Sequence, residues 1–509
     1  MQQTDIAFIG SGAAATTTLI ELFSKLLEQS GTHPTINITV IEKHPEFWKG
    51  VPYGSRSSIN SLTITGVTDF VSVGQEKERF QTWLQTNHKR WTTYYRENGG
   101  LAAETWFDKN LTMVERGEWN DVYLPRFVFG IYMQERLLGL LHEAEDKKLV
   151  KVTLIRAEAI GISKAQAGYE IQLEDGQKKY SQLKAKKLVI AIGSAPVKSN
   201  GPEISGNSFA YINDIYSPSP DANLKLLKET LEKTTDPQKR NVLMIGSNAS
   251  AIEFLYLLNH QPDILTALKK VIVISRAGRM PYNISEELLE NNSANHLDEL
   301  KSGSYDVHQL AAAMQKDMAD AIDDTVFITH INRIIGYALE LLQTLDEDSK
   351  AVFYSIYGPQ ITKQIRRSGP AYKGASDNLT DTGKLELIKG EYKGIAENQS
   401  GAILTYLDSE NQKQAALQHF KVVINCTGSN SLKNTSSRLL KNIINENLVD
   451  LTISGEGIWV DENFRAADNL YIIGPLLAGN YNKLVHFWHL ENVSRMLYLA
   501  PFLAKELLR

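Results

Sequence analysis

The chain has 509 residues, enough for two to four domains with sizeable cores. Its 54 Lys and Arg nearly balance its 59 Asp and Glu, which argues against a dominant basic surface for nucleic acid or anionic membrane. The single cysteine, Cys426, excludes an internal disulfide framework, a four-cysteine zinc site and a dithiol relay. No positive region precedes the first apolar run and no stretch reaches the length of a membrane span, so a cytoplasmic location is expected.

The first 42 residues predict a strand, a glycine turn, a helix and a second strand, the unit of a parallel doubly wound sheet. In the motif Gly10-x-Gly12-x-x-Ala15, Gly10 permits a tight turn, Gly12 lets the backbone approach a pyrophosphate, and Ala15 lets helix and strand pack closely. Glu42 ends the second strand, where a carboxylate accepts hydrogen bonds from a ribose diol. A bare structural turn is the alternative, but the strand, the helix and Glu42 together favour dinucleotide binding.

The next part of the chain is an expected insertion followed by strands. Residues 47–150 are rich in aromatics and predict loops and helices inserted into the first domain. Strands are expected at 154–162, 169–173 and 188–192, the last ending on Gly193. A stretch rich in Pro, Ser and Asn, from Ser194 to about Asn223, predicts the boundary of a second domain.

The second domain repeats the opening pattern in degraded form. An apolar strand at 241–245 precedes Gly246, and Asn248 stands where the first motif has its middle glycine. Asparagine tolerates a left-handed backbone better than other non-glycine residues, so the turn is expected to survive. A helix at 252–258 follows the turn.

The end of the next strand, at 271–274, carries basic rather than acidic residues. Ser275 and Arg276 occupy the position of Glu42, and Arg279 follows. A guanidinium suits a ribose 2′-phosphate, which a carboxylate would repel. The pattern predicts NADPH at this site, with a solvated basic turn as the alternative.

The remaining segments complete the second domain and return to the first. Residues 284–345 predict helices whose apolar stripe, including two methionines, is expected to be core. Shorter strands run to Cys426, Gly428 follows the last of them, and a strand at 470–473 and a closing helix end the chain. The small-residue turns at Gly193 and Gly428 are typical of the crossings between the domains of two-dinucleotide flavoproteins.

The chain resembles the two-dinucleotide-binding flavoproteins and, more narrowly, the bacterial FAD-NAD(P)-binding family, which includes amino-acid N-monooxygenases such as aspartate N-hydroxylases. The resemblance spans nearly the whole chain and rests on these segments: GSGAAA (10–15), GVPYG (50–54), Asn60 in SSINSL, FQTWL (80–84), YLPRFVFGIY (123–132), SRAGRMP (275–281), VINCTG (423–428) and YIIGPLLAG (471–479). It implies one bound FAD and one exchanging NADPH. Two departures stand out: Pro475 follows Gly474 where many flavoproteins have Asp, and the Trp-Glu pair common in the narrower family is missing.

The resemblance favours direct flavin chemistry with oxygen, because Cys426 has no partner thiol. The candidate polar residues near the flavin are Asn60, Arg126 and Lys483; Asn60 and Arg126 serve either catalysis or cofactor binding, and a salt bridge that anchors the insertion is the alternative for Arg126. Arg366 and Arg367 suit an anionic ligand, but a solvated basic turn is favoured.

Two further groups carry expectations. The pair His486 and His489, near Glu491, is expected to serve packing or substrate hydrogen bonding rather than a metal. The aromatics of the insertion either shield a C4a-hydroperoxyflavin from water or form plain core: Tyr53, Phe80, Trp83, Tyr123, Phe127, Phe129 and Tyr132.

The predicted fold is α/β, with two Rossmann-like domains. The FAD domain is expected to comprise 1–199 and 429–509, with the NADPH domain, 200–428, inserted into it. The predicted function is that of an FAD- and NADPH-dependent monooxygenase that hydroxylates a small amine or amino acid with molecular oxygen. The alternatives are an NADPH oxidase or reductase with another acceptor, and a flavin-bound sensor with little turnover. A homo-oligomer is possible, and neither nucleic acid nor membrane is expected as a partner.

Overall fold

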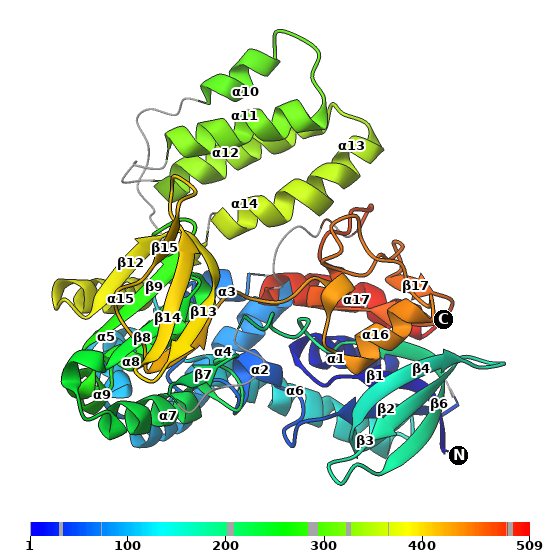
Figure 1. The fold of residues 1–509 in the computed structure, drawn as a ribbon. Helices are drawn as coiled ribbons and strands as arrows, with labels where there is room; N and C mark the ends of the chain where they lie inside the picture. Colours follow the sequence, from blue (N-terminus) through cyan, green and yellow to red (C-terminus); the bar gives the residue numbers. More distant parts are fainter. Residues whose placement is uncertain are drawn as a thin grey trace.

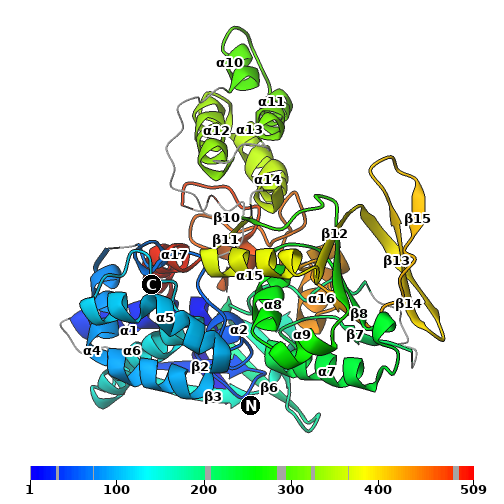
Figure 2. The ribbon, with the colours of Figure 1, turned by 90° about the vertical axis from the view of Figure 1, so that its left-hand side faces the viewer.

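Two sheets flanked by helices, one mixed and one parallel, form the body of the molecule, and a helical body stands above them (Figure 1, Figure 2). The structure is a computed structural model that describes residues 2–29, 34–72, 74–200, 208–283, 294–321, 327–364, 366–484, 486 and 492–509. No helix in these ranges is both long and apolar enough to cross a membrane.

The first sheet has the order β17-β18-β6-β1-β2-β3, with the hairpin β4–β5 continuing from β6. Its strands are β1 (Gln2–Ile9), β2 (Ile36–Glu42), β3 (Val150–Arg156), β4 (Glu158–Lys164), β5 (Tyr169–Glu174), β6 (Tyr180–Ile190), β17 (Arg465–Ala467) and β18 (Leu470–Ile472). Strand β1 pairs in parallel with both β2 and β6, and β18 adds on the other side of β6. The sheet is therefore built from two parts of the chain far apart in sequence.

One predicted strand is wrong. The stretch 154–162 forms parts of two strands, because the chain turns at Ala157, whose N–H donates to the carbonyl of Glu42. Before the turn, β3 pairs in parallel with β2; after it, β4 pairs antiparallel with β5. An apolar run does not show where a strand leaves its neighbour.

Helices cover the first sheet and make up most of the aromatic insertion, as predicted. They are α1 (Ala13–Glu28), α2 (Gly50–Tyr53), α3 (Val67–Phe70), α4 (Gly74–Asn98), α5 (Gly100–Arg116), α6 (Arg126–Asp146), α16 (Arg438–Asn445) and α17 (Val493–Leu507). Short 3-10 turns lie at Pro237–Lys239, Leu432–Asn434 and Pro475–Leu477. Helix α1 buries an apolar face that includes Leu19, Phe23 and Leu26, which explains its place against the sheet.

The second sheet is parallel, with the order β12-β9-β8-β16-β7. Its strands are β7 (Ala210–Ile212), β8 (Asn241–Ile245), β9 (Lys270–Ser275), β12 (Leu385–Lys389) and β16 (Val422–Asn425). The helices around it are α7 (Pro220–Lys233), α8 (Ala249–Asn259), α9 (Pro262–Ala267) and α15 (Pro370–Asp381). An antiparallel sheet lies beside it, made of β13 (Glu391–Asn398), β14 (Gly401–Leu407) and β15 (Lys413–Ala415). All five residues of β8 are buried, as the apolar run predicts.

The helical body has a core of its own. It contains α10 (Asn295–Leu300), α11 (Val307–Asp320), α12 (Phe327–Leu342), α13 (Glu347–Val352), the π-helical turn η2 (Phe353–Tyr357) and α14 (Gly358–Gln364). The predicted stripe is core at Val307, Leu310, Met314 and Met318, while Ile322 lies outside the described residues. The short parallel strands β10 (Tyr282–Asn283) and β11 (Arg367–Ser368) pair where the chain enters and leaves this body.

Candidate functional site

The turn after β1 can be formed only with glycine at its first position. Gly10 has φ +96°, and a Cβ there would lie 2.4 Å from the carbonyl oxygen of Ala191. Gly12 is different: it caps α1 with φ −74°, and its Cβ would meet only the Cα of Gly50, at 3.6 Å. Gly10 thus secures the fold of the turn, whereas Gly12 keeps the N-terminus of α1 open to a ligand. Ala15, in the first turn of α1, is fully buried, as close packing of helix and strand requires.

A third glycine completes this surface and was missed as a site residue. Gly50, at the start of α2, has φ +64°, and a Cβ there would lie 2.9 Å from the Cα of Gly12. The segment GVPYG was noted in the sequence, but nothing in a single sequence shows that it packs against the first turn. The close approach of Gly50 and Gly12 joins the insertion to the dinucleotide turn.

Glu42 is held beside the same turn at the carboxyl end of β2. The N–H and the hydroxyl of Ser11 each donate to its Oε2 at 3.0 Å, and the N–H of His44 donates to its Oε1 at 3.0 Å. The carboxylate is partly exposed, so it retains acceptor capacity for a ribose diol. Ser11, between the two glycines, fixes the direction of this carboxylate.

The ends of β6 and β18 lie at the same edge of the first sheet. Gly193 has φ +79° with open space where a Cβ would be. Gly474 has φ +87°, is buried, and a Cβ there would lie 3.4 Å from the Cβ of Ala14 in α1. The chain before Pro475 therefore passes close to the N-terminus of α1, and its backbone rather than an Asp side chain faces that region.

The second turn has the same form. Gly246 has φ +98°, and a Cβ there would lie 2.6 Å from the carbonyl oxygen of Cys426. Asn248 caps α8 with φ −86° and an exposed side chain that makes no capping hydrogen bond. The turn survives as expected, but Asn248 does not use its tolerance of left-handed backbone, because in this turn Gly246 adopts that conformation. The middle position of this motif tolerates asparagine because its backbone is extended, as it is at Gly12.

The basic residues after β9 lie at the carboxyl edge of the second sheet. Arg276 is exposed directly after Ser275, whose hydroxyl accepts the N–H of Gly278 at 3.1 Å. Arg279 is half-buried, and burial lowers the pKa of its guanidinium. Gly428 follows β16 at the same edge with φ +85° and space beside it.

Of the three candidate catalytic residues, Arg126 has the best-defined surroundings. Its guanidinium forms an ion pair with Glu253 of α8 and donates to the hydroxyl of Ser57 at 3.1 Å. Burial by itself lowers the pKa of Arg126, but the Glu253 carboxylate raises it, and the net shift is upward. The structure thus places Arg126 in the salt bridge that the sequence offered as its alternative role.

Asn60 and Lys483 lie in different surroundings. The Oδ1 of Asn60 is buried and has no hydrogen-bond partner among the described residues, so it is left with an unused acceptor. Lys483 is exposed on the loop before α17. Asn60 directly precedes Ser61, whose carbonyl accepts the N–H of Arg126 at 2.7 Å, but no hydrogen bond or ion pair joins the side chain of Asn60 or Lys483 to Arg126 among the described residues.

The residue that the sequence interpretation missed most clearly is Glu253. It is the single charged residue in α8, whose sequence is ASAIEFLYLLN, and it is only 5% exposed. A carboxylate inside an otherwise apolar helix is a readable signal, because an ionised group is rarely buried without a partner.

The aromatics of the insertion are mostly core. The ring of Phe129 lies 5.1 Å from that of Tyr53 and 5.4 Å from that of Phe80, centroid to centroid, and Tyr132 lies 4.9 Å from Phe80. Trp83 packs on Tyr132, and Phe127 packs on Tyr94 and Tyr95. Tyr123 is different, since its ring lies against Gly369, at the start of α15 beside the second sheet.

The remaining candidates have structural contacts or lie outside the described residues. Cys426 is buried, and burial raises the pKa of its thiol to about 12, in keeping with a structural role. Arg367 donates to Asn332 of the helical body, and burial lowers the pKa of Arg366. His486 stacks on Tyr481, whereas His489 and Glu491 lie outside the described residues.

One group in the described chain has the composition of a metal site, in the helical body. His296, Asp317 and Asp320 bring three possible ligand atoms within 4.8 Å of one another. The Asp317 carboxylate, however, accepts the N–H groups of His296 and Leu297 at 3.0 Å, so it caps the start of α10. Helix capping accounts for this arrangement.

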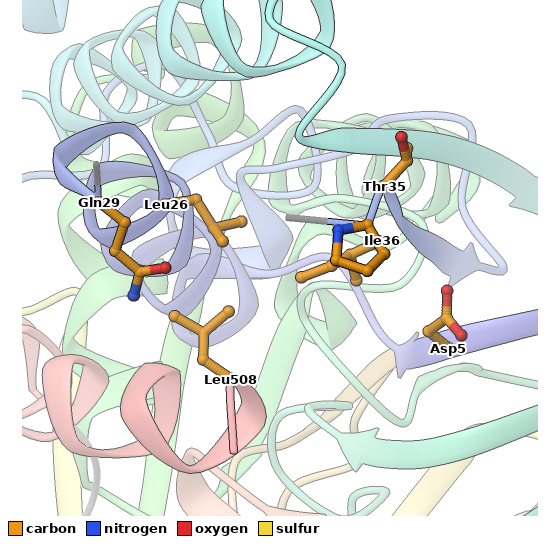
Figure 3. Close-up of a pocket in the computed structure, with 7 residues that line it drawn as sticks. Asp5, Leu26, Gln29, Thr35, Ile36 and Leu508 are labelled. Atoms are coloured by element: carbon orange, nitrogen blue, oxygen red, sulfur yellow. The ribbon is translucent and has the colours of Figure 1, made fainter. Parts of the chain in front are cut away.

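A surface pocket lies at the opposite end of the first sheet from the glycine turn (Figure 3). Asp5 and Ile36 line it from the early parts of β1 and β2, with Leu26 and Gln29 from the end of α1 and Leu508 after α17. Ligands of open α/β sheets bind at the carboxyl ends of the strands. This pocket is therefore separate from the candidate site.

Comparisons with known proteins agree with this geometry. The sequence profile of the FAD-NAD(P)-binding family matches residues 7–195. Uncharacterized proteins of Mycobacterium tuberculosis and Mycobacterium bovis are 33% identical over 516 residues, covering 99% of this chain and 95% of theirs.

Among solved structures, the chain is similar to DfoA of Erwinia amylovora, a cadaverine monooxygenase bound to FAD, with TM-score 0.58, 14% identity, and coverage of 100% of this chain and 95% of that one. It is also similar to the reduced form of ornithine hydroxylase from Pseudomonas aeruginosa, with TM-score 0.50, 11% identity, and coverage of 99% and 98%. At these identities the two structures establish the shared fold.

Proposed function

Because the chain belongs to the FAD-NAD(P)-binding family, we propose that it is an FAD- and NADPH-dependent oxidoreductase, and specifically a single-component monooxygenase that hydroxylates a small amine or amino acid. The observation that carries the proposal is the pair of glycine turns at the carboxyl ends of parallel strands in two sheets, with an acidic residue beside the first turn and basic residues beside the second. That pairing suits one flavin and one phosphorylated nicotinamide nucleotide.

The residues around the first turn fit FAD. The open N-terminus of α1 at Gly12 suits the pyrophosphate, and the carboxylate of Glu42, oriented by Ser11, suits the ribose diol. Gly193 leaves open space at the same edge, and Gly474 brings its backbone close to the N-terminus of α1. When bound, FAD carries electrons from NADPH to oxygen, chemistry that no protein side chain supplies.

The residues around the second turn fit NADPH. The N-terminus of α8 at Asn248 offers unpaired N–H groups to a pyrophosphate, and Arg276 offers an exposed guanidinium to a 2′-phosphate. We assign the FAD-binding unit to 1–199 and 429–509 and the NADPH-binding unit to 200–428, because the strands of the two sheets divide in this way.

Two observations support hydroxylation over a reductase reaction. The single thiol is buried and protonated, so this chain has no dithiol with which to pass electrons to a disulfide. The two structures that share its fold over nearly the full length act on a diamine and an amino acid with an amine side chain, by their names. A primary amine is therefore the substrate class that we propose.

The test begins with the purified protein and its absorption spectrum. Bound flavin is expected, and NADPH consumption is expected to rise when the correct amine or amino acid from a panel is added, with a hydroxylated product of equal amount. If the amount of hydrogen peroxide formed equals the NADPH consumed, and no amine raises the rate of NADPH consumption, the result would favour an oxidase instead. Absence of flavin would reject the flavoenzyme proposal as a whole.

A further inference from the structure

The buried carboxylate of Glu253 obtains its partners from outside the helix on which it lies. Arg126, at the start of α6, forms the ion pair, and the hydroxyl of Ser61 donates to the same oxygen at 2.7 Å. The hydroxyl of Tyr216 donates to the other oxygen at 2.9 Å. Arg126 and Ser61 belong to the insertion of the first sheet, whereas Glu253 belongs to the second unit, so this contact joins the two.

Further hydrogen bonds tie the same segment of the insertion to the second unit. The hydroxyl of Ser58 donates to Asp221 of α7 at 2.8 Å. The N–H of Leu62 donates to the hydroxyl of Tyr372 at 2.8 Å, and that hydroxyl donates to the carbonyl of Leu62 at 2.9 Å. Arg56 donates to the carbonyl of Tyr216 at 3.2 Å. Residues 56–62 therefore lie in a polar interface with the helices of the second unit.

This interface lies between the two dinucleotide turns. Residues 56–62 follow Gly50 closely, and Gly50 contacts Gly12 at the first turn. Glu253 lies five residues after Asn248, about 7.5 Å along α8 at 1.5 Å per residue. A short path of direct contacts thus connects the first dinucleotide turn to the helix that begins at the second.

We propose that Glu253 is a positioning residue, which through Arg126 and Ser61 holds the helix of the second dinucleotide turn in a fixed orientation to the first. The proposal rests on the proposed function in one respect, since the orientation matters for hydride delivery only if the two turns bind FAD and NADPH. A buried ion pair is well suited to this role, because a misaligned orientation leaves two buried charges without partners and is strongly disfavoured.

The substitution Glu253→Gln removes the charge and keeps the shape. The matched control is Glu506→Gln: Glu506 is also 5% exposed and paired with arginines, Arg465 and Arg509, but all three belong to the first unit. Both variants lose a buried carboxylate, but Glu506→Gln leaves two half-exposed arginines, whereas Glu253→Gln leaves the largely buried Arg126 unpaired. Glu506→Gln is therefore expected to lose less stability, and the melting temperature of each variant is measured beside its kinetics. Only Glu253→Gln is expected to change the orientation of the two units relative to each other.

The orientation is measured with spin labels on cysteines introduced at Lys184 of β6 and Lys225 of α7, both exposed. The native Cys426 is buried, so it is not expected to take up the label. A narrow distance distribution is expected in the otherwise unchanged protein and in Glu506→Gln, and a broad or shifted one in Glu253→Gln. An unchanged distribution in Glu253→Gln would overturn the proposal. This measurement needs no bound cofactor, so it decides the matter even if the proposed function fails.

A second experiment measures the effect of orientation on electron transfer. It records the rate at which saturating NADPH reduces the bound flavin without oxygen, in a stopped-flow instrument. Glu253→Gln is expected to slow this reduction at least tenfold, while the dissociation constant for NADP+ stays within threefold and reduction by dithionite is unchanged. The double variant with Arg126→Gln is expected to be no slower than Glu253→Gln alone. An equal slowing in Glu506→Gln would show that loss of stability, not orientation, is responsible. Failure of the unchanged protein to accept electrons from NADPH would instead reject the proposed function.

Discussion

The choice between NADPH and NADH is expected to depend on Arg276. This residue follows β9 directly, its side chain is exposed, and it forms no salt bridge within the described part of the chain. Its charge is therefore available to an anionic ligand at the carboxyl edge of the second sheet. We expect Arg276→Ala to weaken NADPH use and to leave NADH use nearly unchanged.

The expected magnitude follows from the exposure of the guanidinium. A hydrogen bond to a charged group contributes about 1.5–3 kcal/mol, and screening by water at an exposed position places Arg276 in the lower half of that range. A loss of about 1.5–2 kcal/mol corresponds to roughly a 10- to 30-fold rise in the dissociation constant. Surface substitutions of this kind alter stability by no more than about 0.5 kcal/mol, so the melting temperature should hardly change.

The assay compares kcat/KM for NADPH and NADH, together with the dissociation constants of NADP+ and NAD+. Lys269→Ala is the matched control, because Lys269 is an exposed cation at the opposite end of β9 and its removal changes the net charge equally. Equal losses with both nucleotides in Arg276→Ala would refute a 2′-phosphate contact. A loss of NADPH affinity in Lys269→Ala as large as in Arg276→Ala would assign the effect to long-range charge instead.

Four further predictions concern the two turns and the thiol. Gly10→Ala should destabilise the protein by at least about 1–3 kcal/mol, from its positive φ and the clash with Ala191, seen as a lower melting temperature and lost flavin. Gly12→Ala should cost less than about 1 kcal/mol but still weaken FAD binding; full flavin retention would argue against phosphate approach at Gly12. Asn248→Ala should change the free energy of unfolding by no more than about 0.5 kcal/mol, since the side chain makes no capping hydrogen bond. A large fall in this free energy, measured by chemical denaturation, would show an unrecognised contact. Cys426, with its pKa raised to about 12, stays protonated below that pH, so a disulfide reagent at pH 8 should modify it only after denaturant is added.

Much of the fold was predictable from local patterns. The strands β8 and β9 were recognised because parallel strands buried on both faces are continuous apolar runs, and the turns were recognised by Gly10 and Gly246. The break at Ala157 was not predictable, because it depends on which neighbouring strand each half joins. Pairing partners are a property of the assembled sheet, which a short apolar segment does not encode.

The candidate site was predictable to a smaller extent. The positions of Glu42 and Arg276 could be predicted, because each lies at the end of the second strand of a strand-turn-helix-strand unit. Such a position is at the carboxyl edge of its own sheet. The contact between Gly12 and Gly50 and the pair of Arg126 with Glu253 were not, since each joins segments separated by tens of residues or more. The survival of the second turn with Asn248 was predictable, but the reason was not, because asparagine is tolerated there through an extended backbone rather than a left-handed one.

The division of the first sheet between two distant parts of the chain has a consequence for synthesis on the ribosome. The second sheet has all its strands once β16 has emerged, whereas the first still lacks β18, which pairs with β6. Domains generally fold as units while the chain is being made. The second unit, in the middle of the chain, is thus expected to fold first. The first sheet is expected to become complete only after β18 has been synthesised. A nascent chain arrested between β16 and β18 should accordingly show protease resistance in the second unit while the first is still digested.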